Sequence, residues 1–124
     1  MPDDEELAKD IEQLKFRISQ LMELVDPERN AFVFHCMGAN LSEHQVKAIY
    51  DLMDETRKGI KESKPIHHAE FERRVYEIVP SKNGDYHFAE GIVSTLYDKR
   101  RYEEVFKHMQ KSGMNIHDDR DEKA

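Results

Sequence analysis

An apolar residue recurs every three or four positions along the first 25 residues, and this repeat constrains the fold more than any other feature of the sequence. The spacings alternate between four and three through about three heptads, as in the helices of a coiled coil. β-branched residues occupy the a positions and leucines the d positions, and this arrangement favours a parallel coiled coil of two helices. These positions are termed the heptad seam and are Leu7, Ile11, Leu14, Ile18, Leu21 and Val25.

The heptad seam has two interpretations. Residues 4–25 form either an oligomerisation helix or one helix of an intramolecular bundle. Asp10 at a g position can pair with Lys15 at an e position of another copy, which favours the first interpretation. Phe16 and Met22 widen the apolar face beyond the seam, as packing into a globular core requires. We expect a subunit interface, with the bundle helix as the alternative.

Start and stop signals divide the rest of the chain into short helices. Asp26 and Pro27 predict a helix start, because aspartate accepts amide hydrogen bonds and proline suits the first helical position. This helix is predicted to run to about Met37. Gly38 is expected to end it in a left-handed conformation.

The next two helices have equally local signals. Ser42 and Gln45 fit a capping box, which predicts a helix start. Gly59 is the expected end of that helix. Pro65 is expected to open the following helix, and Pro80 to end it.

Two further helices complete the expected fold. Asp85 can cap the first of them, and Gly113 is expected to end the second. No segment reads as a convincing strand. The sequence therefore predicts an all-α fold, a multi-helical bundle of about five to six helices. We expect one domain over residues 1–116, followed by a disordered acidic tail over residues 117–124.

The charge distribution limits the classes of partner. Residues 1–30 hold nine acidic and four basic residues, and residues 117–124 hold four and two. The residues between carry equal numbers, so the net charge of −7 arises from the two ends. An acidic protein with a neutral middle repels phosphate groups. We therefore expect neither nucleic acid nor a membrane as a partner, but a homo-oligomer, with a partner protein as a further prospect.

The start of the chain and its single cysteine suggest a compartment. The first residues lack the basic and apolar regions of a secretory signal. No apolar run approaches the roughly 18 residues of a membrane span. One cysteine cannot form an intrachain disulfide, and Cys36 lies in an apolar run, where we expect a small buried side chain. These features predict a cytoplasmic protein.

Seven histidines make metal binding the first chemical hypothesis. The weak candidate ligands are His67, His68, Glu70 and Glu72, of which His68 and Glu72 stand four apart on one helical face. None belongs to a diagnostic metal motif, and no phosphate-binding loop or nucleophile elbow is present. We expect solvated helix surface there, with no metal, no cofactor and no catalytic residue. The basic run Lys99–Arg101 has acidic neighbours, so we expect ion pairs there too.

Three segments of the chain resemble the YhaI-like family of small Bacillus proteins. They are Phe34–Val46, Asp85–Glu90 and Tyr102–Phe106, which are packing and capping motifs. The resemblance spans roughly residues 4–113. It implies an all-helical cytosolic protein, and it implies no activity and no catalytic residue.

The expected function follows from the heptad seam. We expect a small, non-enzymatic helical protein that self-associates and acts as an interaction or regulatory module. The alternative is a helical bundle that binds a metal or small ligand through histidine and glutamate side chains.

Overall fold

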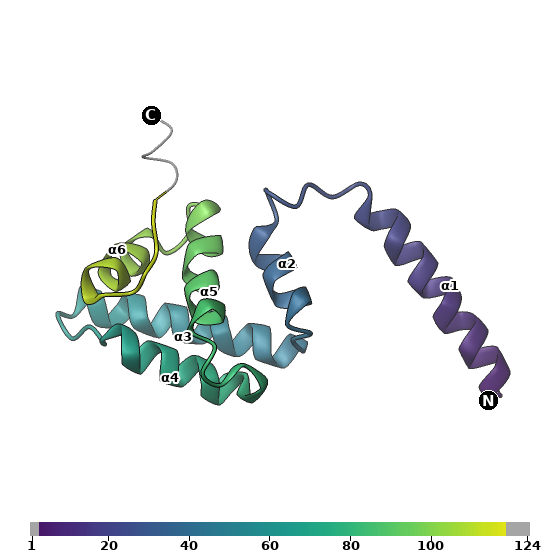
Figure 1. Cartoon of the computed structure of the whole chain (residues 1–124), viewed down its shortest axis with the longest axis horizontal. Helices are drawn as coiled ribbons and strands as arrows, with labels where there is room; N and C mark the ends of the chain where they lie inside the picture. Colours follow the sequence, from purple (N-terminus) through teal and green to yellow (C-terminus); the bar gives the residue numbers. More distant parts are fainter. Residues whose placement is uncertain (1–2, 119–124) are drawn as a thin grey trace. The chain divides into compact units, whose positions relative to one another are not determined.

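The computed structural model describes residues 3–118, and within them every regular element is helical (Figure 1). The predicted all-α fold is confirmed. Six α-helices and one short 3-10 helix follow one another along the described chain. Their bounds are α1 Asp4–Met22, α2 Ala31–Gly38, α3 Glu43–Lys61, α4 His68–Ile78, η1 Pro80–Lys82, α5 Tyr86–Asp98 and α6 Glu103–Ser112.

The chain divides into two compact units. The first is Met1–Asn30 and contains α1, and the second is Ala31–Ala124 and contains the other helices. The sequence predicted one domain over residues 1–116, whereas the contacts divide the chain after Asn30.

In the first unit, α1 is a single amphipathic helix of 19 residues. The Asp3 carboxylate accepts a hydrogen bond from the Glu6 amide at 2.8 Å, which caps the first turn. The acidic side chains in that turn interact favourably with the positive end of the helix dipole. The helix ends at Met22, so Val25 lies beyond it and only five seam residues are helical. The seam is thus shorter than the sequence predicted.

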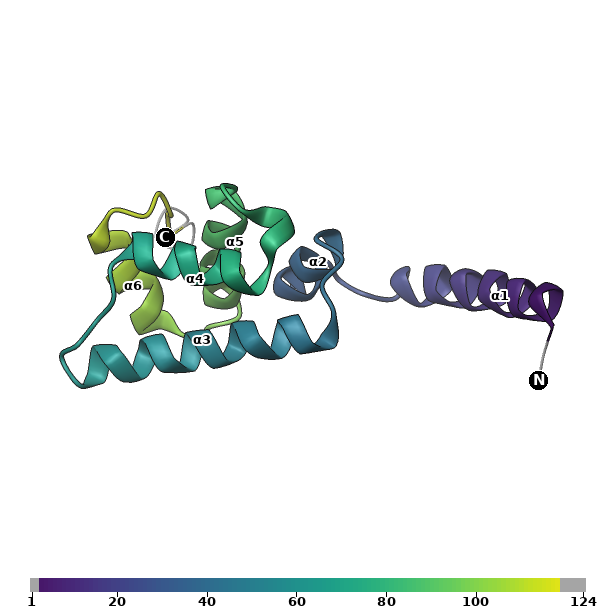
Figure 2. The same cartoon turned by 90° about the horizontal axis from the view of Figure 1, so that it is seen from below.

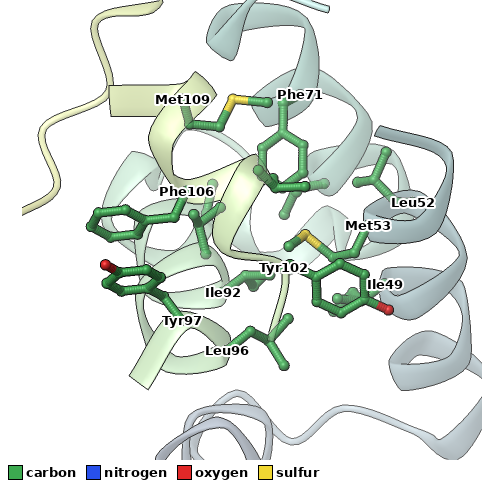
Figure 3. Close-up of a cluster of buried hydrophobic side chains, with 14 of the residues drawn as sticks. Ile49, Leu52, Met53, Phe71, Ile92, Leu96, Tyr97, Tyr102, Phe106 and Met109 are labelled. Atoms are coloured by element: carbon green, nitrogen blue, oxygen red, sulfur yellow. The ribbon is translucent and has the colours of Figure 1, made fainter. Parts of the chain in front are cut away.

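In the second unit, α3 runs along one side of α4, α5 and α6 (Figure 2). It packs on α4 and α6, while α5 packs on α2, α4 and α6. The core side chains come from all five helices of the unit, and Figure 3 shows those around α3, α5 and α6. The largest fully buried ones are Phe32, Phe71, Phe106, Ile49, Met53, Ile92, Leu96 and Met109.

A histidine joins α2 to α5. The His35 ring stacks on Phe88 with centroids 4.8 Å apart, and its Nε2 donates to the Phe88 carbonyl at 3.0 Å. The ring lies over Gly91, where an added Cβ would stand 2.4 Å from the His35 Cε1. Only glycine leaves room for the ring in this position.

The predicted start of the second helix is wrong by four residues. Asp26 does accept the Glu28 amide at 3.0 Å, but the Asn30 side chain donates to the Asp26 carbonyl. In a helix that carbonyl would accept the Asn30 amide. The bonds close a turn instead, and α2 begins at Ala31.

The predicted end of this helix, at about Met37, is correct to within one residue, but the expected left-handed conformation of Gly38 is wrong. Gly38 is its last residue, and Asn40 adopts the left-handed conformation, with φ of 55°. Asparagine tolerates this region better than most residues. The turn lets the Leu41 amide donate to the Cys36 carbonyl at 3.1 Å.

Gly59 does not end α3, which continues to Lys61. A Cβ at this position would lie 2.8 Å from the Lys64 carbonyl oxygen, so glycine permits a close approach of the following loop. The left-handed residue after the helix is Ser63, with φ of 59°. Pro65 likewise does not open α4, which begins at His68 with His67 as its cap.

The remaining local predictions are confirmed. Ser42 and Gln45 form the capping box in both directions. Pro80 follows the end of α4, and Asp85 accepts the Phe88 amide at the start of α5. Gly113 ends α6 with φ of 115°.

The predicted tail lies mostly outside the described residues, which end at Asp118. Within them, the Tyr97 hydroxyl donates to the Asp118 carboxylate.

Candidate functional site

The heptad seam is exposed along the whole of α1. Its five helical residues have between 45% and 61% of their surface exposed, and no side chain of the helix is buried. Every other α-helix of the described chain buries at least two side chains. The first unit alone therefore presents an apolar stripe with no cover of its own.

Charged side chains flank this stripe. Within α1, Lys9 pairs with Glu5 at 3.7 Å and Lys15 with Glu12 at 3.6 Å. Both pairs are largely exposed, so they contribute little and yield readily to other partners. No ion pair within the described residues engages Asp10 or Arg17, which border the stripe.

The four weak metal candidates lie on the first part of α4 and the residue before it, and their side chains engage different groups. The His67 Nδ1 accepts the Ala69 amide at 3.2 Å as the cap of α4. The His68 Nδ1 is hydrogen-bonded to the Ser112 hydroxyl of α6 at 3.1 Å. Local capping and packing thus use both imidazoles.

The two glutamates behave differently from each other. Glu70 forms a two-point contact with Arg73, which lowers the pKa of its carboxyl group. Burial raises the pKa of Glu72, and His68 opposes that rise. The described residues contain no group of three or more His, Cys, Asp or Glu side chains that could hold a metal ion. The geometry therefore offers no support for the metal-binding alternative.

Sequence analysis missed a second cluster, in which arginine and tyrosine side chains join α3 to the start of α6. Two guanidinium groups lie near the Tyr102 ring, with Arg57 4.8 Å and Arg101 5.5 Å from its centroid. Arg101 also lies over the Tyr50 ring at 4.9 Å. The ion pairs predicted for this basic run are replaced at Arg101 by cation–π contacts.

Tyr102 anchors this cluster. Its hydroxyl donates to the Asp54 carboxylate at 2.6 Å, and burial together with that bond raises its pKa to about 12. Its backbone is left-handed, with φ of 57°. Arg57 pairs with Asp54 and Glu104 at 3.3 and 3.8 Å. The two carboxylates thus pair with Arg57, while Arg101 contacts the tyrosine rings, and the cluster acts as a clamp between α3 and the start of α6.

Cys36 is buried in the core, as predicted. Burial raises the pKa of its thiol to about 11, so little thiolate forms near neutral pH. This side chain is suited to packing, and a nucleophilic role is disfavoured.

Comparison of the chain with protein families, curated proteins and solved structures finds no match. Within the described part of the chain, no helix has the length and apolar character that a membrane span requires. The exposed apolar stripe of α1 is the strongest candidate for a functional surface among the features described above.

Proposed function

We propose that this chain is a small helical interaction module that associates with further copies of itself through α1. The observation that carries the proposal is the exposure of all five helical seam residues. Removal of apolar surface from water lowers the free energy of the system. Most helices in proteins also depend on packing of their apolar face for their stability. A second copy of α1 supplies that packing for both helices at once.

An interaction or regulatory role agrees with the other features of the chain. The clusters that could have suggested chemistry serve as caps, ion pairs and packing contacts within the described residues. The resemblance to the YhaI-like family forms part of the proposal and adds the expectation of a cytoplasmic location. Binding of a partner protein is a further part of the proposal.

Light scattering coupled to size-exclusion chromatography tests the proposal on the full chain. We expect the wild-type chain to elute as an oligomer and Ile18→Asn to elute as a monomer. The matched control is Phe16→Asn, because Phe16 is similarly exposed on the same helix but lies off the seam. It loses the same kind of apolar side chain and is expected to remain oligomeric.

A wild-type monomer at the highest soluble concentration would contradict the proposal. The seam would then belong to the intramolecular bundle that the sequence left as the alternative. Equal loss of assembly in the two variants would show that helix formation, and not the seam, limits association.

A further inference from the structure

The ends of α1 restrict how a second copy can align with it. One heptad before Ile11, the a position is Asp4, and one heptad after Leu21, the d position is Glu28. If two parallel helices slip by one heptad, Asp4 faces Ile11, while Ile18 and Leu21 face residues that lie beyond the end of α1. Burying an unpaired carboxylate against apolar groups is costly. Parallel helices therefore align in register, with five helical layers formed by Leu7, Ile11, Leu14, Ile18 and Leu21.

Flanking charges agree with the parallel alignment. A residue at g of one parallel helix meets the e residue five positions later on its partner. This places Asp10 of each copy against Lys15 of the other, which gives two ion pairs. Asp10 has no ion pair in the described chain, and the exposed contact between Lys15 and Glu12 is weak.

Antiparallel alignments are less favourable. In the alignment that overlaps the whole seam, e residues face e residues and g residues face g residues. Lys15 then meets Lys15, Arg17 meets Arg17, and Leu7 faces Val25, which lies beyond the helix. A shift by one heptad brings Asp10 to Arg17 but sets Leu21 against Asp4. Each of these alignments retains four helical apolar layers, against five in the parallel pair.

We propose that the occupant of the heptad seam is α1 of one other copy, parallel and in register, with Asp10 of each copy against Lys15 of the other. This inference rests on the proposed function, because it requires self-association through α1. The β-branched a positions and leucine d positions favour a pair over larger assemblies.

Disulfide trapping in the full chain tests the alignment. Leu7→Cys and Leu21→Cys place thiols at the two ends of the seam, and oxidised glutathione supplies the oxidant. In the parallel pair each residue faces its own equivalent, so both variants are expected to form covalent dimers. In the antiparallel alignments, equivalent residues at these positions lie about 15 Å or more apart along the helix axis. A disulfide requires Cα atoms within about 7 Å, so these variants would stay unlinked.

Two controls accompany the trapping experiment. Phe16→Cys carries an exposed thiol off the seam and is expected to stay unlinked, which measures random encounters. The wild-type chain contains only the buried Cys36 thiol and is expected to stay unlinked as well. Linking of Phe16→Cys as fast as Leu7→Cys would overturn the alignment.

Charge exchange gives an independent readout. Lys15→Asp places two acidic residues together in the parallel pair, and we expect the dimer dissociation constant to rise about tenfold. The double variant Asp10→Lys with Lys15→Asp restores both pairs and is expected to regain wild-type affinity. In the shifted antiparallel alignment, Asp10→Lys sets a positive charge against Arg17, so the double variant weakens the dimer instead.

The failures of the two proposals are distinguishable. A monomeric wild-type chain removes self-association itself. A dimer whose end-position cysteines stay unlinked retains self-association and overturns only the parallel alignment. A molar mass of three or four chains in light scattering overturns the proposal that two copies associate.

Discussion

Two helices of equal length, α1 and α3, are used in opposite ways. Both contain 19 residues and both carry one apolar face. The apolar face of α3 is covered by α4 and α6, and it buries Ile49, Leu52 and Met53. No side chain of α1 is buried. Amphipathic periodicity thus establishes that a helix needs a partner, but it does not show whether the partner belongs to the same chain.

The largest expected effect comes from one pair of substitutions that compares the core of the second unit with an exposed position of α1. Phe71 in α4 is fully buried and Phe16 in α1 is exposed. We expect Phe71→Ala to lower the free energy of unfolding of the second unit by about 3–5 kcal/mol, and Phe16→Ala to leave it unchanged. All five tyrosines lie in the second unit, so tyrosine fluorescence during denaturation reports on that unit. A matching loss in Phe16→Ala would show that the stability of the second unit depends on α1.

A smaller effect is expected between α2 and α5. Gly91→Ala forces the His35 ring away from its stack on Phe88, and we expect a loss of about 1–3 kcal/mol in the same measurement. Gly38→Ala is the control, because a Cβ there meets open space. It is expected to change stability by less than about 1 kcal/mol, with stabilisation the expected direction. Equal changes in the free energy of unfolding for Gly91→Ala and Gly38→Ala would mean that the His35 ring moves aside without loss of stability.

Helix caps extend the comparison to the ends of the two helices. Ser42→Ala removes the cap of α3 and is expected to lower the stability of the second unit by about 1 kcal/mol. Asp3→Ala removes the equivalent hydrogen bond from α1. It is expected to reduce helical circular dichroism while leaving the tyrosine-detected transition unchanged. A shift of that transition in Asp3→Ala would contradict the independence of the two units.

The smallest effect concerns the clamp at Tyr102. The fold raises the pKa of this hydroxyl from 10.0 to about 12, so its contribution to stability is complete below pH 10 and is lost as the pH rises toward 12. Tyr102→Phe removes the hydrogen bond to the exposed Asp54 carboxylate. We expect a loss of about 0.5 kcal/mol at neutral pH, the low end for one hydrogen bond, because water replaces the donor. Tyrosinate absorbance should lose its last titrating step, and a curve identical to wild type would exclude the raised pKa.

The sequence predicted the helices better than their ends. The heptad repeat located α1, and start and stop signals located the other five α-helices. The ends of the helices depended on competing contacts with neighbouring segments, which a rule based on single residues does not include. Gly59 looked like a stop signal, but its lack of a Cβ serves the approach of the Lys64 carbonyl. At Asp26 the cap formed, yet the Asn30 side chain closed a turn in place of the helix.

For the candidate sites too, the sequence predicted local features but not the contacts that depend on packing. The seam residues on α1 were predicted from spacing alone, and their exposure required the structure. The clamp around Tyr102 escaped sequence analysis, because Tyr50 and Arg57 lie far from it along the chain and only packing of α3 on α6 joins them. His67 and His68 suggested ligands, but spacing could not reveal that capping and Ser112 would engage them.

The short segment between α1 and α2 has a consequence for avidity. Eight residues separate the end of α1 from the start of α2, and they span at most about 28 Å when extended. Paired α1 helices would therefore keep two copies of the second unit within several tens of ångströms of each other. At such separations the effective local concentration reaches the millimolar range. A weak affinity of one second unit for a repeated or dimeric target would then become a strong one without any new contact.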